Sequence, residues 1–190
     1  MVLSRPDLLD YIESGRLRFD PAVPADSVEQ VSVDLHLGRR FARFRRAGLG
    51  FLGSVRVHPS LWQADVWERQ ETDAFTLEPG ELVLAQTLEV VTIPNDVMGL
   101  VEGRSTWARV GVSVHISAPK IDPGFHGTIT PEMANLGPMP VLLTAGEDRP
   151  CQLILLRLTT PCPESEQYGT RTTHFFQGQR APIPPRQQER

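Results

Sequence analysis

Apolar and polar residues alternate along much of this chain, and the alternation predicts a protein built mainly from short β-strands. Residues 31–38, VSVDLHLG, show the alternation of a half-buried strand. Residues 77–94, LEPGELVLAQTLEVVTIP, begin with a Pro-Gly turn and continue as a long strand pattern. Further short strands are expected at VSVHIS (112–117), GTITPEMANL (127–136), MPVLLTA (139–145) and CQLILLRL (151–158).

One segment, residues 4–17, has a helical pattern instead. Ser4 can cap its start, Pro6 suits its first turn, and Gly15 can end it. The face turned to the core would carry Leu8, Leu9 and Ile12. With few other helical signals beyond a turn or two near residues 103–109, the expected fold is mostly β, a distorted barrel or a two-sheet jelly roll with an N-terminal helix and few short helices.

Two neighbouring segments weaken the strand pattern. Residues 41–50, FARFRRAGLG, suggest an edge strand or a turn. Residues 46–72 have weak periodicity and several glycines, and we expect an irregular connection with room for one strand.

Composition narrows the class of protein. The chain has 190 residues, 40% of them hydrophobic and 22% charged, which suits one globular domain. A net charge of -4 disfavours general nucleic-acid binding. There is no apolar run long enough for a membrane span and no signal-peptide pattern, so a cytoplasmic protein is expected. Two cysteines make no disulfide framework, and Cys151 is interpreted as a small core residue.

The composition changes from Pro161 onward, where Pro, Gln, Arg and Thr become common. A frayed tail is one interpretation. The aromatic residues Tyr168, Phe175 and Phe176 are unusual in disordered sequence and favour another. We therefore predict a domain at residues 1–160 and an arm at 161–190 that becomes ordered over a ligand or a neighbouring subunit.

The stretch VEGRSTWARVGV (101–112) mixes apolar residues with hydrogen-bond donors. Burial is expected for Val101, Trp107, Ala108, Val110 and Val112. The donors that follow Gly103 are Arg104, Ser105, Thr106 and Arg109. Two guanidiniums and two hydroxyls beside a possible helix start suit an anion such as a phosphate chain, although the P-loop spacing is absent. Surface arginines on a short helix are the alternative.

A second cluster, IDPGFHGTITPEM (121–133), joins a tight Asp-Pro-Gly turn to a strand pattern. Alternation places Thr130 and Glu132 on one face, and Ile129 and Pro131 on the other. A glutamate in partly apolar surroundings can transfer protons near neutral pH, whereas the alternative is an outward-facing side chain on an edge strand. The histidines lack metal-site spacing and the zinc-deaminase motif is absent, so no zinc is expected.

Together these stretches resemble the deoxycytidine triphosphate (dCTP) deaminase family, relatives of the trimeric dUTPases. The specific combination is GRS-x-x-AR, then IDPG-F-x-G, then a glutamate eight residues past the Pro-Gly. The resemblance rests on SVDLHLG (32–38), LEPGELVLAQTLEVVTIP (77–94), VEGRSTWARVGVSVHIS (101–117), IDPGFHGTITPEMAN (121–135), CQL (151–153) and YG…FQGQRAPIPPR (168–186). It implies a dUTPase-like barrel.

The resemblance implies hydrolytic deamination of dCTP to dUTP and ammonia without zinc. Glu132 would take a proton from the water that attacks C4 of cytosine, and would pass protons to N3 and the departing amine. Ser105 and Arg109 would place the water and stabilise charge. The family also implies a homotrimer with sites shared between subunits, magnesium carried on the nucleotide phosphates, and possible inhibition by dTTP.

The same resemblance implies a substrate-binding set. Phosphates would contact residues 104–106, and the deoxyribose would contact Asp122. The base would contact Thr130 and Pro131, and the closing arm would supply Tyr168 and Gln179. The full expected set is Arg104, Ser105, Thr106, Arg109, Ala118, Asp122, Thr130, Pro131, Gln152, Tyr168, Arg171, His174 and Gln179.

The sequence also departs from the family pattern. Family arms carry a Lys or Arg four residues before the final Gln, where this chain has Phe175. Either Arg171 or His174 substitutes for that cation, or the nucleotide preference differs. Pro131 and Trp107 each replace a usual Leu, and the loop GEDRP (146–150) is one residue longer and more polar than usual.

The sequence gives conflicting signals about the product. Family members that hydrolyse the triphosphate and release dUMP have a Gly and an aromatic residue before Ile-Asp, whereas this chain has Pro119 and Lys120. Gln152 and the QGQRAPIPP tail instead resemble the dUMP-forming type. We expect deamination to dUTP alone. The alternatives are a bifunctional enzyme forming dUMP and diphosphate, a plain dUTPase, which would not need Glu132, and a non-catalytic nucleotide-binding protein.

Overall fold

β-Strands dominate residues 1–45 and 66–182, the parts of the chain that the computed structural model describes. The strands are β1 (Arg18–Asp20), β2 (Ser32–Leu35), β3 (Arg40–Phe44), β4 (Trp67–Glu71), β5 (Ala74–Leu77), β6 (Leu82–Leu84), β7 (Val90–Thr92), β8 (Val97–Gly103), β9 (Val112–Ser113), β10 (Lys120–Ile121), β11 (His126–Thr128), β12 (Glu132–Asn135), β13 (Val141–Thr144) and β14 (Cys151–Arg157). The helices are α1 (Arg5–Glu13) and α2 (Ser105–Ala108), with 3₁₀ turns η1 (Ala25–Ser27) and η3 (Glu164–Glu166). The predicted mostly-β class is confirmed.

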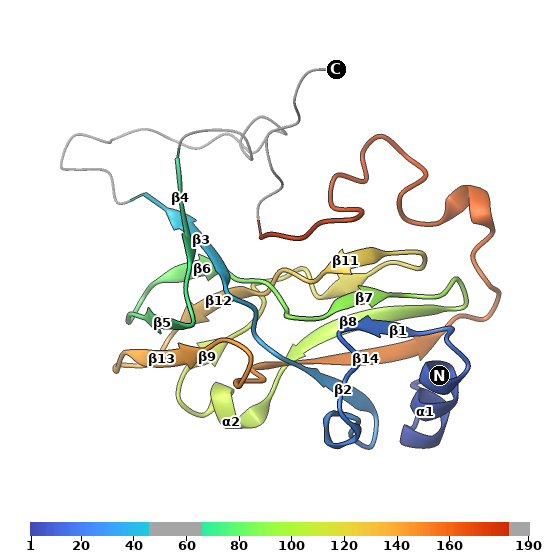
Figure 1. The fold of residues 1–190 in the computed structure, drawn as a ribbon, viewed down its shortest axis with the longest axis horizontal. Helices are drawn as coiled ribbons and strands as arrows, with labels where there is room; N and C mark the ends of the chain where they lie inside the picture. The colour runs from blue at the N-terminus through green and yellow to red at the C-terminus, as the bar shows by residue number, and fades with distance from the viewer. Residues whose placement is uncertain (46–65, 183–190) are drawn as a thin grey trace.

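The described strands form four antiparallel sheets (Figure 1), with orders β10-β8-β14-β2, β4-β3-β6-β12-β9, β1-β7-β11 and β13-β5. The expected strand content of a distorted barrel is confirmed. The sheets of the described residues stay separate and do not join into a closed barrel. Most of the expected connection at residues 46–72 lies outside the described residues, but its end forms β4, which pairs with β3. No described helix has both the length and the apolar character to cross a membrane.

β14 lies at the centre of the core sheet. It pairs with β8 over seven positions, from Cys151↔Gly103 to Arg157↔Val97, and with β2 on its other side. Alternate β14 residues are buried, as the pattern predicts. The sequence pattern does not predict β8. In β2 the expectation of a half-buried strand is wrong, because all four residues are buried, including Ser32 and Asp34.

Helix α1 begins where the sequence predicts and ends earlier. The Ser4 backbone N–H donates to Asp7 at 3.1 Å, which satisfies a donor at the helix start. The helix ends at Glu13, and Gly15 follows with a φ of 71°. Of the predicted face only Leu8 is fully buried, while Tyr11 takes a core position that the pattern does not assign.

A close backbone contact joins the α2–β9 turn to the end of β12. Leu136 N–H donates to Gly111 O at 2.7 Å. Gly111 has a φ of 93°, and a Cβ there would lie 2.3 Å from the Gly137 nitrogen. Only glycine satisfies both constraints, so Gly111 sets how closely the α2 segment approaches β12.

Gly111→Ala should lower the free energy of unfolding, because the new side chain strains the backbone and also forces two backbone segments apart. Gly146→Ala is the control: with a φ of 79° and open space around it, it should lower the free energy of unfolding by about 1–2 kcal/mol through backbone strain alone. The loss in Gly111→Ala should therefore be the larger one. Urea unfolding of both variants measures the difference, and equal losses would contradict the steric argument.

Candidate functional site

A cavity of about 330 Å³ lies between β8, β12 and the chain after residue 167. Six of the predicted site residues line it: Ala118, Asp122, Thr130, Glu132, Tyr168 and Gln179. Phe125, Ile129 and Phe176 add apolar walls. An apolar cavity with a few converging polar groups is the usual form of a small-molecule site.

Glu132 begins β12 and faces this cavity. Its register opposite Leu84 and the burial of Met133 follow the strand alternation that the sequence predicts. The backbone N–H of Ile116 donates to Glu132 Oε2 at 3.3 Å, which links the carboxylate to the segment after β9. Pro131 is buried and does not line the cavity, although its carbonyl accepts from Ala85 N–H at 2.9 Å.

Four cavity residues outside the predicted set come from residues 114–121: Val114, His115, Lys120 and Ile121. Lys120 is the only lysine of the sequence, and its Nζ lies 2.6 Å from Asp122 Oδ1. His115 Nε2 lies 3.2 Å from Glu102 Oε2, and Ile121 adds an apolar contact. Their place in the sequence, between the anion-binding pattern and Glu132, could have identified them, because a segment that joins two site motifs passes close to the site.

The chain from Tyr168 to Gln179 lies along β11, where the red segment crosses the upper part of Figure 1. Tyr168 N–H donates to Pro123 O at 2.8 Å, and Thr128 N–H donates to Gln179 O at 3.0 Å. The Gln179 side chain donates to Thr128 O at 2.6 Å and to Thr130 Oγ1 at 3.2 Å. Burial raises the pKa of the Tyr168 hydroxyl. These contacts place the segment up to residue 182 against the cavity of its own chain.

The two candidate replacements for the arm cation do not reach the cavity of this chain. The His174 ring stacks on Tyr168 with centroids 4.4 Å apart, and its Nδ1 accepts from Gly169 N–H at 2.8 Å. That geometry gives His174 a part in folding the arm. Arg171 and Phe175 are exposed and do not line the cavity.

Helix α2 carries the predicted anion-binding residues away from Glu132. Ser105, Thr106 and Arg109 are exposed and none of them lines the cavity. Figure 1 shows α2 on the opposite side of the molecule from the C-terminal segment. The expected burial of Ala108 and Val110 is wrong, since a short surface helix leaves both side chains exposed, whereas Val101 and Val112 are buried as predicted.

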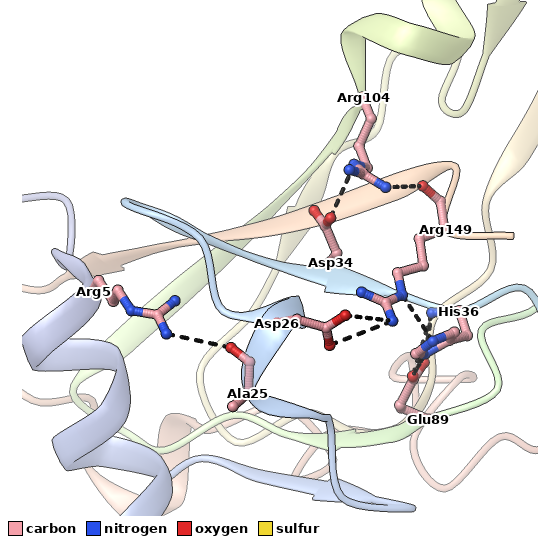
Figure 2. Close-up of polar contacts among 8 residues, drawn as sticks. All are labelled: Arg5, Ala25, Asp26, Asp34, His36, Glu89, Arg104 and Arg149. Atoms are coloured by element: carbon pink, nitrogen blue, oxygen red, sulfur yellow. Dashed lines mark hydrogen bonds and ion pairs between the residues drawn. The ribbon is translucent and has the colours of Figure 1, made fainter. Parts of the chain in front are cut away.

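Arg104, immediately before α2, is anchored by a polar network (Figure 2). Its Nε lies 2.9 Å from Asp34 Oδ2, and its Nη1 donates to Arg149 O at 3.2 Å. Burial raises the pKa of Asp34, and the nearby Arg104 charge opposes that shift. Gln152 lies alongside, donating to Gly103 O at 3.1 Å. The sequence analysis does not identify Asp34, although a charged residue inside a strand pattern could have pointed to a buried ion pair.

Among the described residues, no three His, Cys, Asp or Glu side chains gather as a metal site.

Comparisons with known proteins show which sequences and folds this chain resembles. A family model described as "dCTP deaminase-like" matches residues 2–158. A "dCTP deaminase, dUMP-forming" of Halobacterium salinarum is 39% identical over 183 residues, covering 96% of this chain and 92% of that protein. The protein of the same name from Thermobifida fusca is 39% identical over 189 residues, covering 98% and 92%.

A solved structure shares the fold. The 2'-deoxycytidine 5'-triphosphate deaminase of Agrobacterium tumefaciens matches with a TM-score of 0.63 at 20% sequence identity. The match covers 87% of this chain and 50% of the Agrobacterium chain, so the present chain spans about half that protein's length.

The arm contacts yield a prediction. Gln179→Ala removes two side-chain hydrogen bonds to the cavity wall and should release the arm, raising the rate of trypsin cleavage after Arg171 or Arg180 about tenfold. Thr173→Ala, an exposed change in the same arm, is the matched control. Equal cleavage rates in both variants would show that Gln179 does not anchor the arm.

Proposed function

The chain belongs to the dCTP deaminase-like family, and from that premise we propose that it hydrolyses dCTP to dUMP, ammonia and diphosphate. The dUMP-forming relatives favour this reaction over the release of dUTP, which is the product expected from the sequence alone. The observation that carries the proposal is the position of Glu132 in a mostly apolar cavity beside Thr130 and Asp122.

In the proposed deamination, Glu132 acts as the general base and then the general acid. It removes a proton from water as the oxygen bonds to C4 of cytosine, and the proton passes to N3. A second proton from the attacking water reaches the amine, which leaves as ammonia, and a uracil nucleotide remains. The Ile116 N–H holds the carboxylate at 3.3 Å, which supports a fixed position for the transfer.

In the proposed second step, water attacks the α-phosphorus and the bond to the bridging oxygen of the β-phosphate breaks. The products are dUMP and diphosphate. Magnesium carried on the triphosphate would offset its negative charge, as is usual for such nucleotides.

A homotrimer with shared sites completes the proposal. Ser105 and Arg109 are exposed on α2, remote from the cavity of their own chain, and a second copy can place them beside its Glu132. Exposed apolar side chains surround the α2–β9 turn and the neighbouring loop: Val110, Leu136, Met139 and Leu142. Several exposed large apolar side chains in one part of the fold suit a protein interface. The arm at 161–190 would close the site over the nucleotide, in a cytoplasmic enzyme.

A second candidate, deamination to dUTP alone, rests on Pro119 and Lys120. These residues stand where dUMP-forming members have a Gly and an aromatic residue, and Lys120 lies in the cavity wall.

The reaction is tested by incubating the protein with dCTP and magnesium and resolving the products by ion exchange. We expect dUMP and diphosphate; accumulating dUTP would support the second candidate, and tight dCTP binding without product would indicate a non-catalytic protein. Glu132→Gln should lower kcat at least about 100-fold while dCTP binding persists. Exposed Glu147→Gln is the matched control and should leave kcat unchanged.

The shared site is tested by complementation. Arg109→Ala and Glu132→Gln proteins should each be inactive, and mixed trimers formed by co-expression should recover about a quarter of the active sites, because some sites receive both native residues. Sedimentation should give three times the 21.2 kDa chain mass. Trimers that recover no activity on mixing would contradict a site shared in this way.

A further inference from the structure

The loop before β14 holds both the backbone and the side chain of Arg104. Arg104 N–H donates to Pro150 O at 3.0 Å, and Nη1 donates to Arg149 O at 3.2 Å. Arg104 Nε also forms an ion pair with Asp34, whose Oδ2 lies 2.9 Å away. These contacts hold the guanidinium in place, and within the described residues one of its five N–H groups donates a hydrogen bond, so other N–H groups are oriented for an anion.

Arg149 is itself fixed by an imidazole. Its Nε donates to His36 Nε2 at 2.8 Å, as Figure 2 shows. A guanidinium can only donate, so His36 Nε2 must be the unprotonated nitrogen and Nδ1 must carry the hydrogen. Nδ1 lies 2.6 Å from Glu89 Oε1, which therefore accepts that hydrogen. The sequence of contacts runs from buried Glu89 through His36 and Arg149 to Arg104.

Burial decides which of these contacts matter. The Glu89 side chain is 1% exposed and the His36 side chain 12%, so their hydrogen bonds are little weakened by solvent. Asp26 also pairs with Arg149, at 3.4 Å, but its side chain is 73% exposed and the pair should contribute little. The loop is also joined to the segment after β2 through Leu37 N–H, which donates to Asp148 O at 2.8 Å.

We propose that His36 and Arg149 are positioning residues that hold Arg104 ready for the phosphates of the nucleotide. The proposal rests on the proposed function, since it assigns Arg104 to the triphosphate. A guanidinium fixed before binding loses less conformational freedom when the phosphate arrives, so affinity depends on residues that never touch the nucleotide. The loop at 146–150, longer and more polar than in the family pattern, then has a role: it brings Arg149 to His36.

The test compares two substitutions at residue 149. Gln carries an N–H at the same position along the side chain as Arg Nε, so Arg149→Gln can still donate to His36. Arg149→Met has a similar length and no donor. Both lose the Asp26 pair, and Asp26→Ala serves as the control for that loss.

Binding of dCTP and of inorganic tripolyphosphate is measured by calorimetry, with kcat and KM for dCTP. Arg149→Met should weaken both ligands about threefold to tenfold and raise KM with kcat unchanged, while Arg149→Gln and Asp26→Ala bind like the unaltered protein. Thermal unfolding of the two residue-149 variants checks that the difference is not one of stability.

The outcomes separate the two proposals. Equal binding by Arg149→Met and the unaltered protein would overturn the positioning role, even with dCTP turnover intact. So would equal weakening by Met and Gln, because the donor to His36 would then be irrelevant. If the unaltered protein binds tripolyphosphate and does not convert dCTP, the proposed function fails, and the tripolyphosphate comparison still decides the role of Arg149. If it binds neither ligand, both proposals fail.

Discussion

The register of β14 between β8 and β2 is the constraint on which the other features depend. Pairing Cys151 with Gly103 on one side and with Leu35 on the other brings the end of β8, where Arg104 follows, beside Asp34 of β2. A slip of one residue would turn Leu153 and Leu155 out of the core, so burial strongly specifies the register. Cys151 contributes as a core residue, as predicted: burial raises the pKa of its thiol to about 12, which keeps the thiol protonated.

Two groups of candidate site residues leave this sheet in different directions. The segment between Ile121 and β12, which includes β11, contributes Asp122 and Thr130 to the cavity wall. The strand alternation of β12 directs Glu132 into the cavity while Met133 enters the core. The helix after Arg104 turns outward and exposes Ser105 and Arg109. One chain therefore lines its cavity with Glu132 and leaves Ser105 and Arg109 on its surface, which is the arrangement that the proposed site shared between copies requires.

The strand content and the segments that carry the site could be predicted from sequence, because alternation and turn residues act over short distances. The burial of β2 could not, because the pattern treats Ser32 and Asp34 as outward-facing, whereas Asp34 is buried against Arg104, a residue 70 positions later. Ala108 and Val110 were assigned to the core for the related reason that apolar character alone does not distinguish a buried position from an exposed one. The grouping of Glu132 with Asp122 and Gln179 followed from family spacing; no local pattern predicts it.

The described arm contributes no cation to the cavity wall, which is consistent with Phe175 at the position where family arms carry a Lys or Arg. His174 stacks on Tyr168 and accepts from Gly169 N–H, so its ring is already occupied in shaping the arm. The arm's contribution to the cavity wall consists of Tyr168, Phe176, Gln179 and Pro182, which offer packing and hydrogen bonds without a charge. Positive charge in the described cavity wall instead comes from Lys120, already tied to Asp122 at 2.6 Å. A lysine is a compact charge on a flexible stem, and the carboxylate limits both its freedom and its net field. For the proposed triphosphate, strong attraction therefore has to come from outside this wall, and Arg104 and the exposed Arg109 are the cations that the proposal assigns to it.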